Sequence, residues 1–339
     1  MSAPILPCPA DSLDPAVIER AAAILRDGGL VAIPTETVYG LGANALDAEA
    51  VASIFTAKER PSTDPLIVHV DGLAMAAAVV DGPFPAPATT LAEAFWPGPL
   101  TLVLPRRDSV PPAVSSGLPD VGVRCPSHPT ARAIITAAGV PIAAPSANRF
   151  GRISPTRASH VATELGDRID LIVDAGPCDA GVESTVVSFD GDTAVVLRHG
   201  AIPLESIEHH VAARSVNTAA DEALASPGHD ERHYSPGTPT TAVIAGFDPS
   251  AAPAGDVVYL GYQGETPTLP AGWRFVPLGS RADLAGIARG LYDSLRLADA
   301  GTPDRIVAEL TGAPGLGRAI DDRLTRAGSS RVARSAADL

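Results

Sequence analysis

The sequence predicts a protein of the mixed α/β (α+β) class, in which a twisted sheet covered by helices is followed by a smaller α/β domain. At 339 residues the chain is long enough for two domains with separate cores. Apolar strand-like runs alternate with helical stretches over residues 1–214 and again over residues 240–339. Between them, residues 215–239 contain Pro-Gly twice and no apolar period, which is typical of a linker.

In the first domain, strand and helix signals follow one another along the chain. Asp14 is expected to cap a helix that has Pro15 at its first position and ends at Gly28-Gly29. The pattern further predicts strands over 30–33, 65–70, 99–105, 121–126, 141–146 and 170–176, and helices over 48–57, 90–96, 130–139 and 156–165. A hairpin of two strands, 184–189 and 193–200, is expected to turn at residues 190–192. This mixed order indicates a partly antiparallel sheet.

The residues after the linker repeat the alternation on a smaller scale. Strands are predicted over 240–247, 256–262, 273–279 and 305–310, with a helix over 281–300 and a final helical stretch near the C-terminal end of the sequence. A unit of this size and order is typical of a small, separate α/β domain.

Composition and charge indicate a globular protein without a broad nucleic-acid surface. The hydrophobic fraction of 45% and charged fraction of 19% exclude a disordered chain. The formal net charge of −14 argues against an extended basic surface, so phosphate binding should be confined to a pocket. Cys8, Cys125 and Cys178 have no zinc or disulfide spacing. With no membrane-length apolar run and no signal-peptide pattern, we expect a cytoplasmic protein without a membrane partner.

The segment after the strand 30–33 is dense in hydroxyl side chains, of which Thr35 is the first. Gly40 and Gly42 follow closely. Because glycine has no side chain, the backbone can turn tightly or approach a ligand at this point, and the sequence leaves both possibilities open.

Lys58 and Arg60 stand at alternate positions before Pro61. The proline biases Arg60 towards an extended conformation, in which residues i and i+2 point the same way. The pair is therefore expected to face one ligand, and a polyanion such as a phosphate chain fits it.

Six motifs occur together in one order: PTETVYGLG (34–42), K-x-R-P (58–61) with PLIVH (65–69), VGVRCP (121–126), APSAN (144–148), ESTVV (183–187) and LRHG (197–200). With the linker and the small second domain, they resemble the two-domain form of the YrdC-type threonylcarbamoyl-AMP synthase family. The resemblance implies a YrdC-like twisted mixed sheet followed by a smaller Rossmann-like α/β domain. It implies a nucleotidyltransferase, an L-threonylcarbamoyladenylate synthase, which condenses L-threonine, bicarbonate and ATP into threonylcarbamoyl-AMP and pyrophosphate for the N6-threonylcarbamoyladenosine modification of tRNA.

This reaction builds charge on phosphates, so fixed cations are needed. The resemblance assigns that catalytic role to Lys58, Arg60 and Arg198. It also places on the nucleotide a group of polar side chains, namely Ser62, Ser146, Asn148, Ser154 and Tyr234. Mg²⁺ is expected to arrive with ATP, because no protein ligands for a metal stand out. Taken alone, a lysine or arginine is usually a solvated surface charge, and serine and asparagine often cap turns.

The threonine substrate needs a partner for its carboxylate. Arg124 lies inside an apolar run, and a buried arginine must be paired, so it is the best candidate for a carboxylate clamp. An internal salt bridge to an aspartate or glutamate is the alternative. The resemblance adds Thr35 and Ser184 as hydroxyl contacts.

His69 could reach the same pocket, although a lone histidine on a strand is more often a core residue. Ala144 could form an apolar wall that helps to discriminate against serine, a difference of about 1–3 kcal/mol. Glu36 and Glu183 lie in the right motifs for a general base, but each could equally serve as a cap or a salt-bridge partner, so the sequence leaves the base open.

The linker 215–239 resembles a lid that would exclude water from a labile intermediate, with Tyr234 against the nucleotide. The contacts of Arg232 and His233 stay open. The product would be handed to the tRNA threonylcarbamoyl-transferase machinery, and no stable nucleic-acid binding is expected.

Three alternatives remain. An RNA-binding module would need an extended basic face, which the net charge of −14 disfavours. A carbamoyl-transfer enzyme of the hydrogenase-maturation type would carry zinc-finger cysteine pairs, which this sequence lacks. An enzyme of the same fold that uses another amino acid in place of threonine can be distinguished from a threonine enzyme only by substrate profiling.

Overall fold

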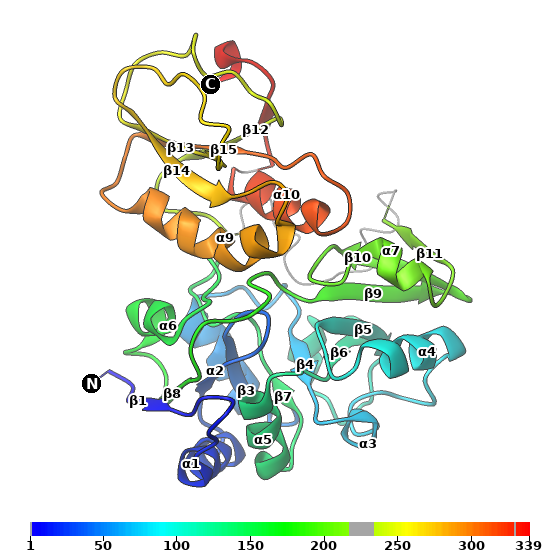
Figure 1. Ribbon diagram of the computed structural model, residues 1–339. Helices are drawn as coiled ribbons and strands as arrows, with labels where there is room; N and C mark the ends of the chain where they lie inside the picture. The colour runs from blue at the N-terminus through cyan, green and yellow to red at the C-terminus, as the bar shows by residue number, and fades with distance from the viewer. Residues whose placement is uncertain (1, 217–233, 329) are drawn as a thin grey trace. The chain divides into compact units, whose positions relative to one another are not determined.

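A computed structural model describes residues 2–216, 234–328 and 330–339 of the chain. The chain divides into two compact units, both shown in Figure 1. Unit 1 comprises Met1–Phe150, Pro155–Asp179 and Glu183–Gly228, and unit 2 comprises Gly151–Ser154, Ala180–Val182 and His229–Leu339. Two short segments that lie between parts of unit 1 in the sequence therefore belong to the second unit.

Unit 1 is built on an 11-stranded mixed sheet with the order β1-β8-β2-β3-β7-β4-β6-β5-β9-β10-β11 (Figure 1). Its strands are β1 (Ile5–Pro7), β2 (Val31–Ile33), β3 (Gly40–Asn44), β4 (Ile67–His69), β5 (Leu100–Pro105), β6 (Asp120–Arg124), β7 (Ile142–Ala143), β8 (Leu171–Asp174), β9 (Thr185–Asp190), β10 (Thr193–Arg198) and β11 (Ala213–Ser215). Its helices are α1 (Pro15–Arg26), α2 (Ala48–Lys58), α3 (Leu73–Ala76), α4 (Ala86–Phe95), η1 (Pro112–Ser115), α5 (Pro129–Ala138), α6 (Ala158–Leu165) and α7 (Leu204–Glu208). Parallel and antiparallel pairs are mixed, as predicted.

The local signals place most of these elements correctly. The Asp14 side chain accepts a hydrogen bond from the amide of Ala16, with Pro15 at the first helical position, so α1 begins where the cap was predicted. The helix predicted over 90–96 begins earlier, at Ala86, directly after Pro85. The hairpin of β9 and β10 forms as expected, with Gly191 at φ +58° in its turn.

Gly40 and Gly42 belong to β3, where a Cβ on Gly42 would lie 3.0 Å from Ile142 Cγ2. Of the two possibilities that the sequence left open for these glycines, the tight turn is excluded, and they let neighbouring strands pack closely. One local expectation is wrong. Lys58 is not extended: it is the last residue of α2, and Glu59 ends the helix in the left-handed conformation at φ +54°.

The central strands of unit 1 have two different faces. Because side chains alternate along a strand, one face carries a registered row of hydrophobic residues that belongs to the main core: Val68, Val123, Leu102, Val187 and Val196. The other face carries a smaller buried cluster, Ile67, Val186, Val195 and Leu197. Polar side chains are interspersed on this second face, which we call the polar face.

Unit 2 contains a parallel five-stranded sheet with the order β14-β13-β15-β12-β16. The strands are β12 (Thr240–Val243), β13 (Val257–Tyr262), β14 (Trp273–Gly279), β15 (Arg305–Glu309) and β16 (Val332–Ala333), and the helices are α9 (Leu284–Asp299), α10 (Leu316–Ala327) and η2 (Ala336–Asp338). A parallel sheet with crossover helices is the Rossmann-like arrangement that was predicted.

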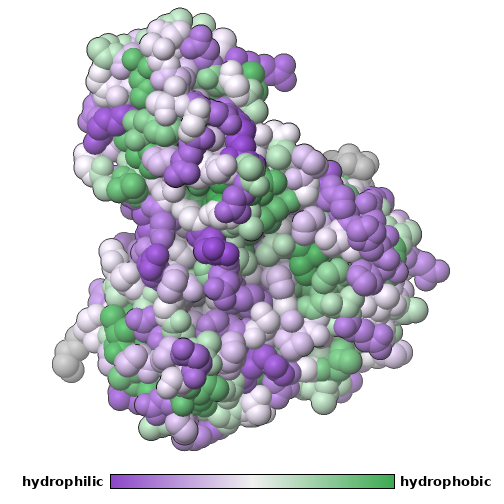
Figure 2. Space-filling model, in the orientation of Figure 1, coloured by the Kyte–Doolittle hydropathy of each residue, from purple (hydrophilic) through white to green (hydrophobic). Residues whose placement is uncertain are grey.

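The predicted linker is described only in part. Ser215, at its start, belongs to β11 and pairs with Val196, while residues 217–233 lie outside the described residues, with Arg232 and His233 among them. In the ranges that are described, no helix is long and apolar enough to cross a membrane. On the face seen in Figure 2, hydrophilic residues are spread over both units between smaller hydrophobic spots.

Candidate functional site

A row of registered residues crosses five neighbouring strands on the polar face of the sheet, and four of its five side chains are polar. His69 on β4 is the register partner of Arg124 on β6, and Arg124 is the partner of Thr101 on β5. Thr101 pairs with Val186 on β9, which pairs with Arg198 on β10. Directly paired residues point to the same face of a sheet, so three predicted site residues from distant parts of the sequence share one row.

A β-bulge decides where Arg198 points. The register of β10 against β9 shifts between Val196 and Arg198, so that one extra residue, Leu197, is inserted. Without the bulge, strict alternation would turn Arg198 to the main core. With the bulge it faces the same side as Val186, since bulges re-aim the side chains that follow them.

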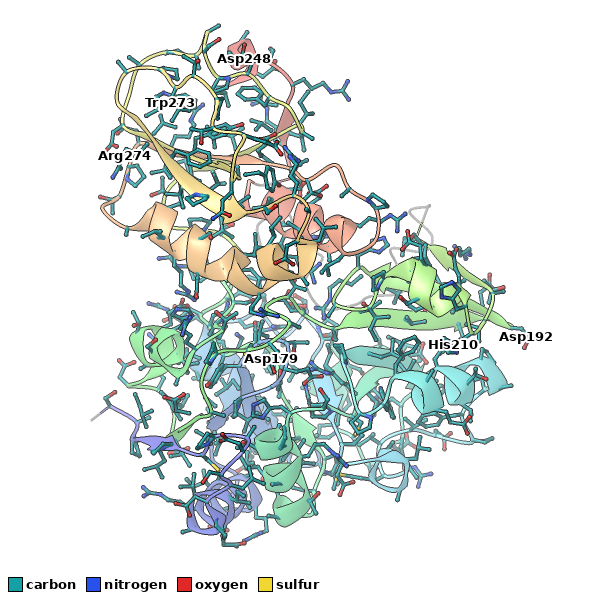
Figure 3. All side chains as sticks on the ribbon, in the orientation of Figure 1. Asp179, Asp192, His210, Asp248, Trp273 and Arg274 are labelled. Atoms are coloured by element: carbon teal, nitrogen blue, oxygen red, sulfur yellow. The ribbon has the colours of Figure 1, made fainter. Side chains whose placement is uncertain are left out.

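Arg198 is bound to the segment that leads into β9. Its Nη2 donates to the carbonyl oxygen of Ser184 at 3.0 Å and to Ser184 Oγ at 3.1 Å. Ser184 Oγ lies 2.8 Å from Thr101 Oγ1. The nucleotide candidate Arg198 and the threonine candidate Ser184 are therefore in direct contact. In Figure 3, Asp192 marks the hairpin turn, at the opposite end of β10 from Arg198.

Arg124 forms the internal salt bridge that the sequence left open. Its Nη2 lies 2.7 Å from Glu36 Oε1, and both side chains are buried. Arg124 Nη1 donates to Thr37 Oγ1 at 2.9 Å. Burial opposes ionisation of Glu36, but the charge and hydrogen bond of Arg124 outweigh it, so the pKa of Glu36 lies below its usual value. Glu36 therefore has the salt-bridge role that the sequence left open.

Two further threonine candidates lie in the same neighbourhood. Thr35 Oγ1 donates to the carbonyl oxygen of Val38 at 2.6 Å and lies 2.8 Å from Thr37 Oγ1, which Arg124 also contacts. His69 is fully buried beside Arg124. Burial and the nearby Arg124 charge lower the pKa of His69 to about 3, so its ring is neutral at physiological pH.

Lys58 is buried at the end of α2. Its ammonium donates to the carbonyl oxygens of Ser146 and Asn148. Burial and the charge of Arg60 lower the pKa of Lys58 well below its usual value. An anionic ligand beside the two cations would counteract that effect, because opposite charges favour the ionised form.

Arg60 is constrained by the turn that follows it. Its Nη2 lies 2.8 Å from Asp64 Oδ2 and donates to the carbonyl oxygen of Pro65 at 2.8 Å. Both partners of the ion pair are buried. Ser62 lies in the same turn, where it is exposed.

The segment after β7 carries the remaining candidates of unit 1. Ser146 is bridged to Gly40 of β3, and a Cβ on Gly40 would lie 3.2 Å from Ala144 Cβ. Asn148 is buried, and its Nδ2 donates to the carbonyl oxygen of Arg149 at 2.8 Å. The Lys58 ammonium holds this segment through the backbone of Ser146 and Asn148.

Ser154 and Tyr234 belong to unit 2. Tyr234 is buried at φ +59°, with its ring stacked on Tyr292 at 5.8 Å between ring centroids. The guanidinium of Arg323 lies 5.3 Å from the Tyr234 ring centroid, a cation–π contact. Within unit 2 the residue that follows, Ser235, donates from its amide to the carbonyl oxygen of Gly151 at 2.8 Å.

Unit 1 thus gathers the predicted residues into two connected groups. One contains Thr35, His69, Arg124, Ser184 and Arg198, and the other contains Lys58, Arg60, Ala144, Ser146 and Asn148. Sequence reasoning missed Thr101, because a threonine within the apolar run 99–105 looks like an ordinary strand residue. The roles of Glu36 and Thr37 follow from their contact with Arg124, which spacing alone does not reveal.

Chemically, the polar face presents guanidinium groups and hydroxyls on a buried sheet. Arg124 is held by Glu36 and Thr37, and Arg198 by Ser184. Such an arrangement can bind a small anion, orient it and stabilise negative charge without reorganisation.

Comparisons with known proteins show which family the chain resembles over nearly its whole length. A family model described as "Telomere recombination" matches residues 23–200, and a model described as "Threonylcarbamoyl-AMP synthase, C-terminal domain" matches residues 202–329. The threonylcarbamoyl-AMP synthase of Bacillus subtilis (strain 168) is 43% identical over 331 residues, covering 94% of each chain. The solved structure of Pyrococcus abyssi Sua5 complexed with L-threonine is 37% identical, with a TM-score of 0.84, and covers 98% of this chain and 99% of its own.

Proposed function

Since the chain belongs to the threonylcarbamoyl-AMP synthase family, and is an enzyme of that class, we propose that it condenses L-threonine, bicarbonate and ATP into threonylcarbamoyl-AMP with release of pyrophosphate. The observation that carries the proposal is the registered row of His69, Arg124, Thr101 and Arg198, with Ser184 bound to its end. In this proposal the row joins residues that would bind the amino acid to a residue that would bind phosphate.

In this proposal L-threonine binds at the Arg124 end of the row. A guanidinium has five N–H donors. Arg124 uses donors on Gly98, Thr37 and Glu36, which hold its plane in place. A donor remains on each terminal nitrogen for the substrate carboxylate. Thr35 and Ser184 supply hydroxyls, His69 a neutral ring, and Ala144 an apolar wall for the methyl group.

ATP would bind where Lys58, Arg60 and Arg198 can face its phosphates, with Ser62, Ser146 and Asn148 as polar contacts. The carbamate oxygen formed from threonine and bicarbonate would attack the α-phosphorus, and pyrophosphate would leave. The cations would stabilise the charge that develops on both phosphate groups. Mg²⁺ would enter with the nucleotide, since it prefers phosphate oxygens and water to protein cages.

Ser154 and Tyr234 are further nucleotide contacts in the proposal. The product would pass to the tRNA threonylcarbamoyl-transferase machinery. We further infer a cytoplasmic enzyme, because Cys8, Cys125 and Cys178 are free and buried, which fits a reducing compartment.

The first test is pyrophosphate release from ATP, Mg²⁺ and bicarbonate, with and without L-threonine. Release should require both bicarbonate and L-threonine, and L-serine should support it less well, because a missing methyl group in an apolar pocket is worth about 1–3 kcal/mol. Release that is equal with and without L-threonine, or its complete absence in the full-length protein, would refute the proposed reaction.

A second test concerns Lys58 in the proposed nucleotide site and uses the fact that the sequence contains a single lysine. Lys58 is the only lysine in the sequence, so ¹⁵N-lysine labelling gives a side-chain amine signal from this residue alone. Saturating Mg²⁺–ATP should shift this signal towards that of a charged ammonium, because the phosphates counteract the effect of burial on the Lys58 pKa. Adenosine, which lacks phosphates, is the control. An unchanged signal with bound ATP would remove Lys58 from the phosphate site.

A further inference from the structure

Thr101 is the one polar member of the cross-sheet row that neither sequence motifs nor the proposed reaction assigns. Its side chain is fully buried on β5, in register with Arg124 on one side and Val186 on the other. Its hydroxyl has one hydrogen-bond partner among the described residues, Ser184 Oγ at 2.8 Å.

The Thr101–Ser184 pair has one more hydroxyl proton than it has acceptors among the described residues. Ser184 Oγ already accepts from Arg198 Nη2 at 3.1 Å, and an arginine N–H is always a donor. Thr101 and Ser184 each bring one hydroxyl proton, but only one proton can lie between their oxygens. Whichever way the bond runs, the other proton has no acceptor among the described residues. A buried donor without an acceptor costs about 1–3 kcal/mol.

The contacts of the two residues favour one direction. Thr101 projects from the middle of the row, and Ser184 Oγ is the one partner of its hydroxyl among the described residues. Ser184 lies before the first residue of β9, and its Oγ also accepts from the Arg198 guanidinium at the end of the row. The positive charge of Arg198 makes the Ser184 hydroxyl the better donor towards an anionic ligand.

We propose that Thr101 is a positioning residue whose hydroxyl donates to Ser184 Oγ and makes Ser184 an obligate donor towards the substrate. With one lone pair taken by Arg198 and the other by Thr101, Ser184 Oγ has only its proton left to offer. It therefore recognises an acceptor and rejects an ammonium group. Beside the two arginines Arg124 and Arg198, the acceptor of matching charge is a carboxylate oxygen of the amino acid, a step that rests on the proposed function.

The matched variants are Thr101→Val, which removes the hydroxyl at nearly constant shape, and Thr101→Ser, which keeps it. Thr101→Val should raise the KM for L-threonine about three- to tenfold, the size of one hydrogen bond, with kcat changed less than about twofold. Thr101→Ser should restore the wild-type KM. In a Ser184→Ala background, Thr101→Val should have no further effect on KM, because the residue acts through Ser184.

Thr130→Val is the control for a merely structural role. Thr130 in α5 is also fully buried, and its Oγ1 donates to the carbonyl oxygen of Cys8 at 2.9 Å. Its loss should lower thermal stability about as much as Thr101→Val without the selective rise in KM. An unchanged KM in Thr101→Val, or equal rises in both variants, would overturn the proposal.

Neutron diffraction of the deuterated protein separates this inference from the proposed reaction. The deuteron of Thr101 should point at Ser184 Oγ, with or without threonine turnover. A Ser184 deuteron directed at Thr101 Oγ1 would refute the donor assignment even if the enzyme is active. Absent turnover with the expected deuteron would refute the proposed function alone.

Discussion

At two places in unit 1 a buried arginine is held in a fixed position by a buried carboxylate. Arg124 and Glu36 are both buried, and each is tolerated only because the other is present. The same holds for Arg60 and Asp64 in the turn after α2. An ion pair of this kind holds a guanidinium in one orientation, which suits a site that must bind an anion before any reaction occurs.

The Arg124 pair allows binding to be separated from stability. Arg124→Met should destabilise unit 1 by about 3–5 kcal/mol, because the Glu36 carboxylate is left buried without its counter-charge. The double variant Arg124→Met/Glu36→Gln should recover most of that stability and still fail to bind L-threonine. Urea unfolding and calorimetric titration with L-threonine measure the two effects. Normal threonine binding by either variant would exclude the carboxylate-clamp role.

His69 predicts a pH dependence of stability. Its pKa is about 3 in the folded protein, against an ordinary value of 6.5, so between these pH values the unfolded chain binds more protons. The His69 contribution is therefore complete above pH 6.5 and is lost as the pH falls towards 3, with a slope of up to about 1.4 kcal/mol per pH unit. Urea unfolding over this range should give a flatter curve for His69→Asn than for the wild type. Parallel curves would show that His69 is not buried as a neutral ring.

At the scale of elements, the β9–β10 hairpin is the part that builds the site. Its bulge turns Arg198 to the polar face, and the chain after β10 folds back against the start of β9. Gly200 makes that return possible, since a Cβ there would lie 2.4 Å from the carbonyl carbon of Ser184. The turn at the other end is less constrained: Gly191 has φ +58°, and a Cβ on this residue would have no atom within 4 Å.

These two glycines give a matched pair of variants. Gly200→Ala should destabilise unit 1 by about 3 kcal/mol or more and raise the KM for L-threonine, because backbone atoms of the Ser184 segment must move. Gly191→Ala should cost about 1–2 kcal/mol, the ordinary penalty of a left-handed residue, and leave KM unchanged. Denaturant unfolding and steady-state kinetics test both expectations. A Gly200→Ala enzyme with normal KM would show that this return does not position Ser184.

At the scale of the whole molecule, the division into units does not follow the sequence order. Gly151–Ser154 and Ala180–Val182 belong to unit 2, although both lie between segments of unit 1. The first follows Asn148 after a few residues, and the second ends directly before Glu183. Within unit 2, Gly181 contacts α9 so closely that a Cβ would lie 2.3 Å from Arg289 Cα.

Gly181→Ala should therefore lower the stability of unit 2. Gly176 is the control, since it has a similar φ of +84° with nothing within 4 Å, against +73° for Gly181. The chain has two tryptophans, Trp96 in unit 1 and Trp273 in unit 2, so Trp273 fluorescence in a Trp96→Phe background follows unit 2 alone. The unfolding midpoint of unit 2 should fall for Gly181→Ala and stay nearly constant for Gly176→Ala. Equal unfolding midpoints of unit 2 in the two variants would mean that α9 moves to accommodate the methyl group added at Gly181.

Local patterns in the sequence predict most of the helices and strands and the side chains that they carry. Caps and glycines locate α1 and the hairpin, because these signals act between residues a few positions apart. The motifs identify Lys58, Arg124, Ser146 and Arg198 as candidates without reference to their positions in the fold. For Gly40 and Gly42 the sequence could not decide, since a glycine that permits close strand packing looks the same in sequence as a glycine in a turn.

How those residues come into contact depends on strand pairing over long distances in the sequence. The register of strands far apart in the sequence brought His69, Arg124 and Thr101 into one row, and a one-residue bulge decided the face of Arg198. Strand register depends on pairing partners that local patterns do not specify, and a shift of one residue turns a side chain to the opposite face. For the same reason Thr101 and the Glu36–Arg124 pair became visible only in the folded chain.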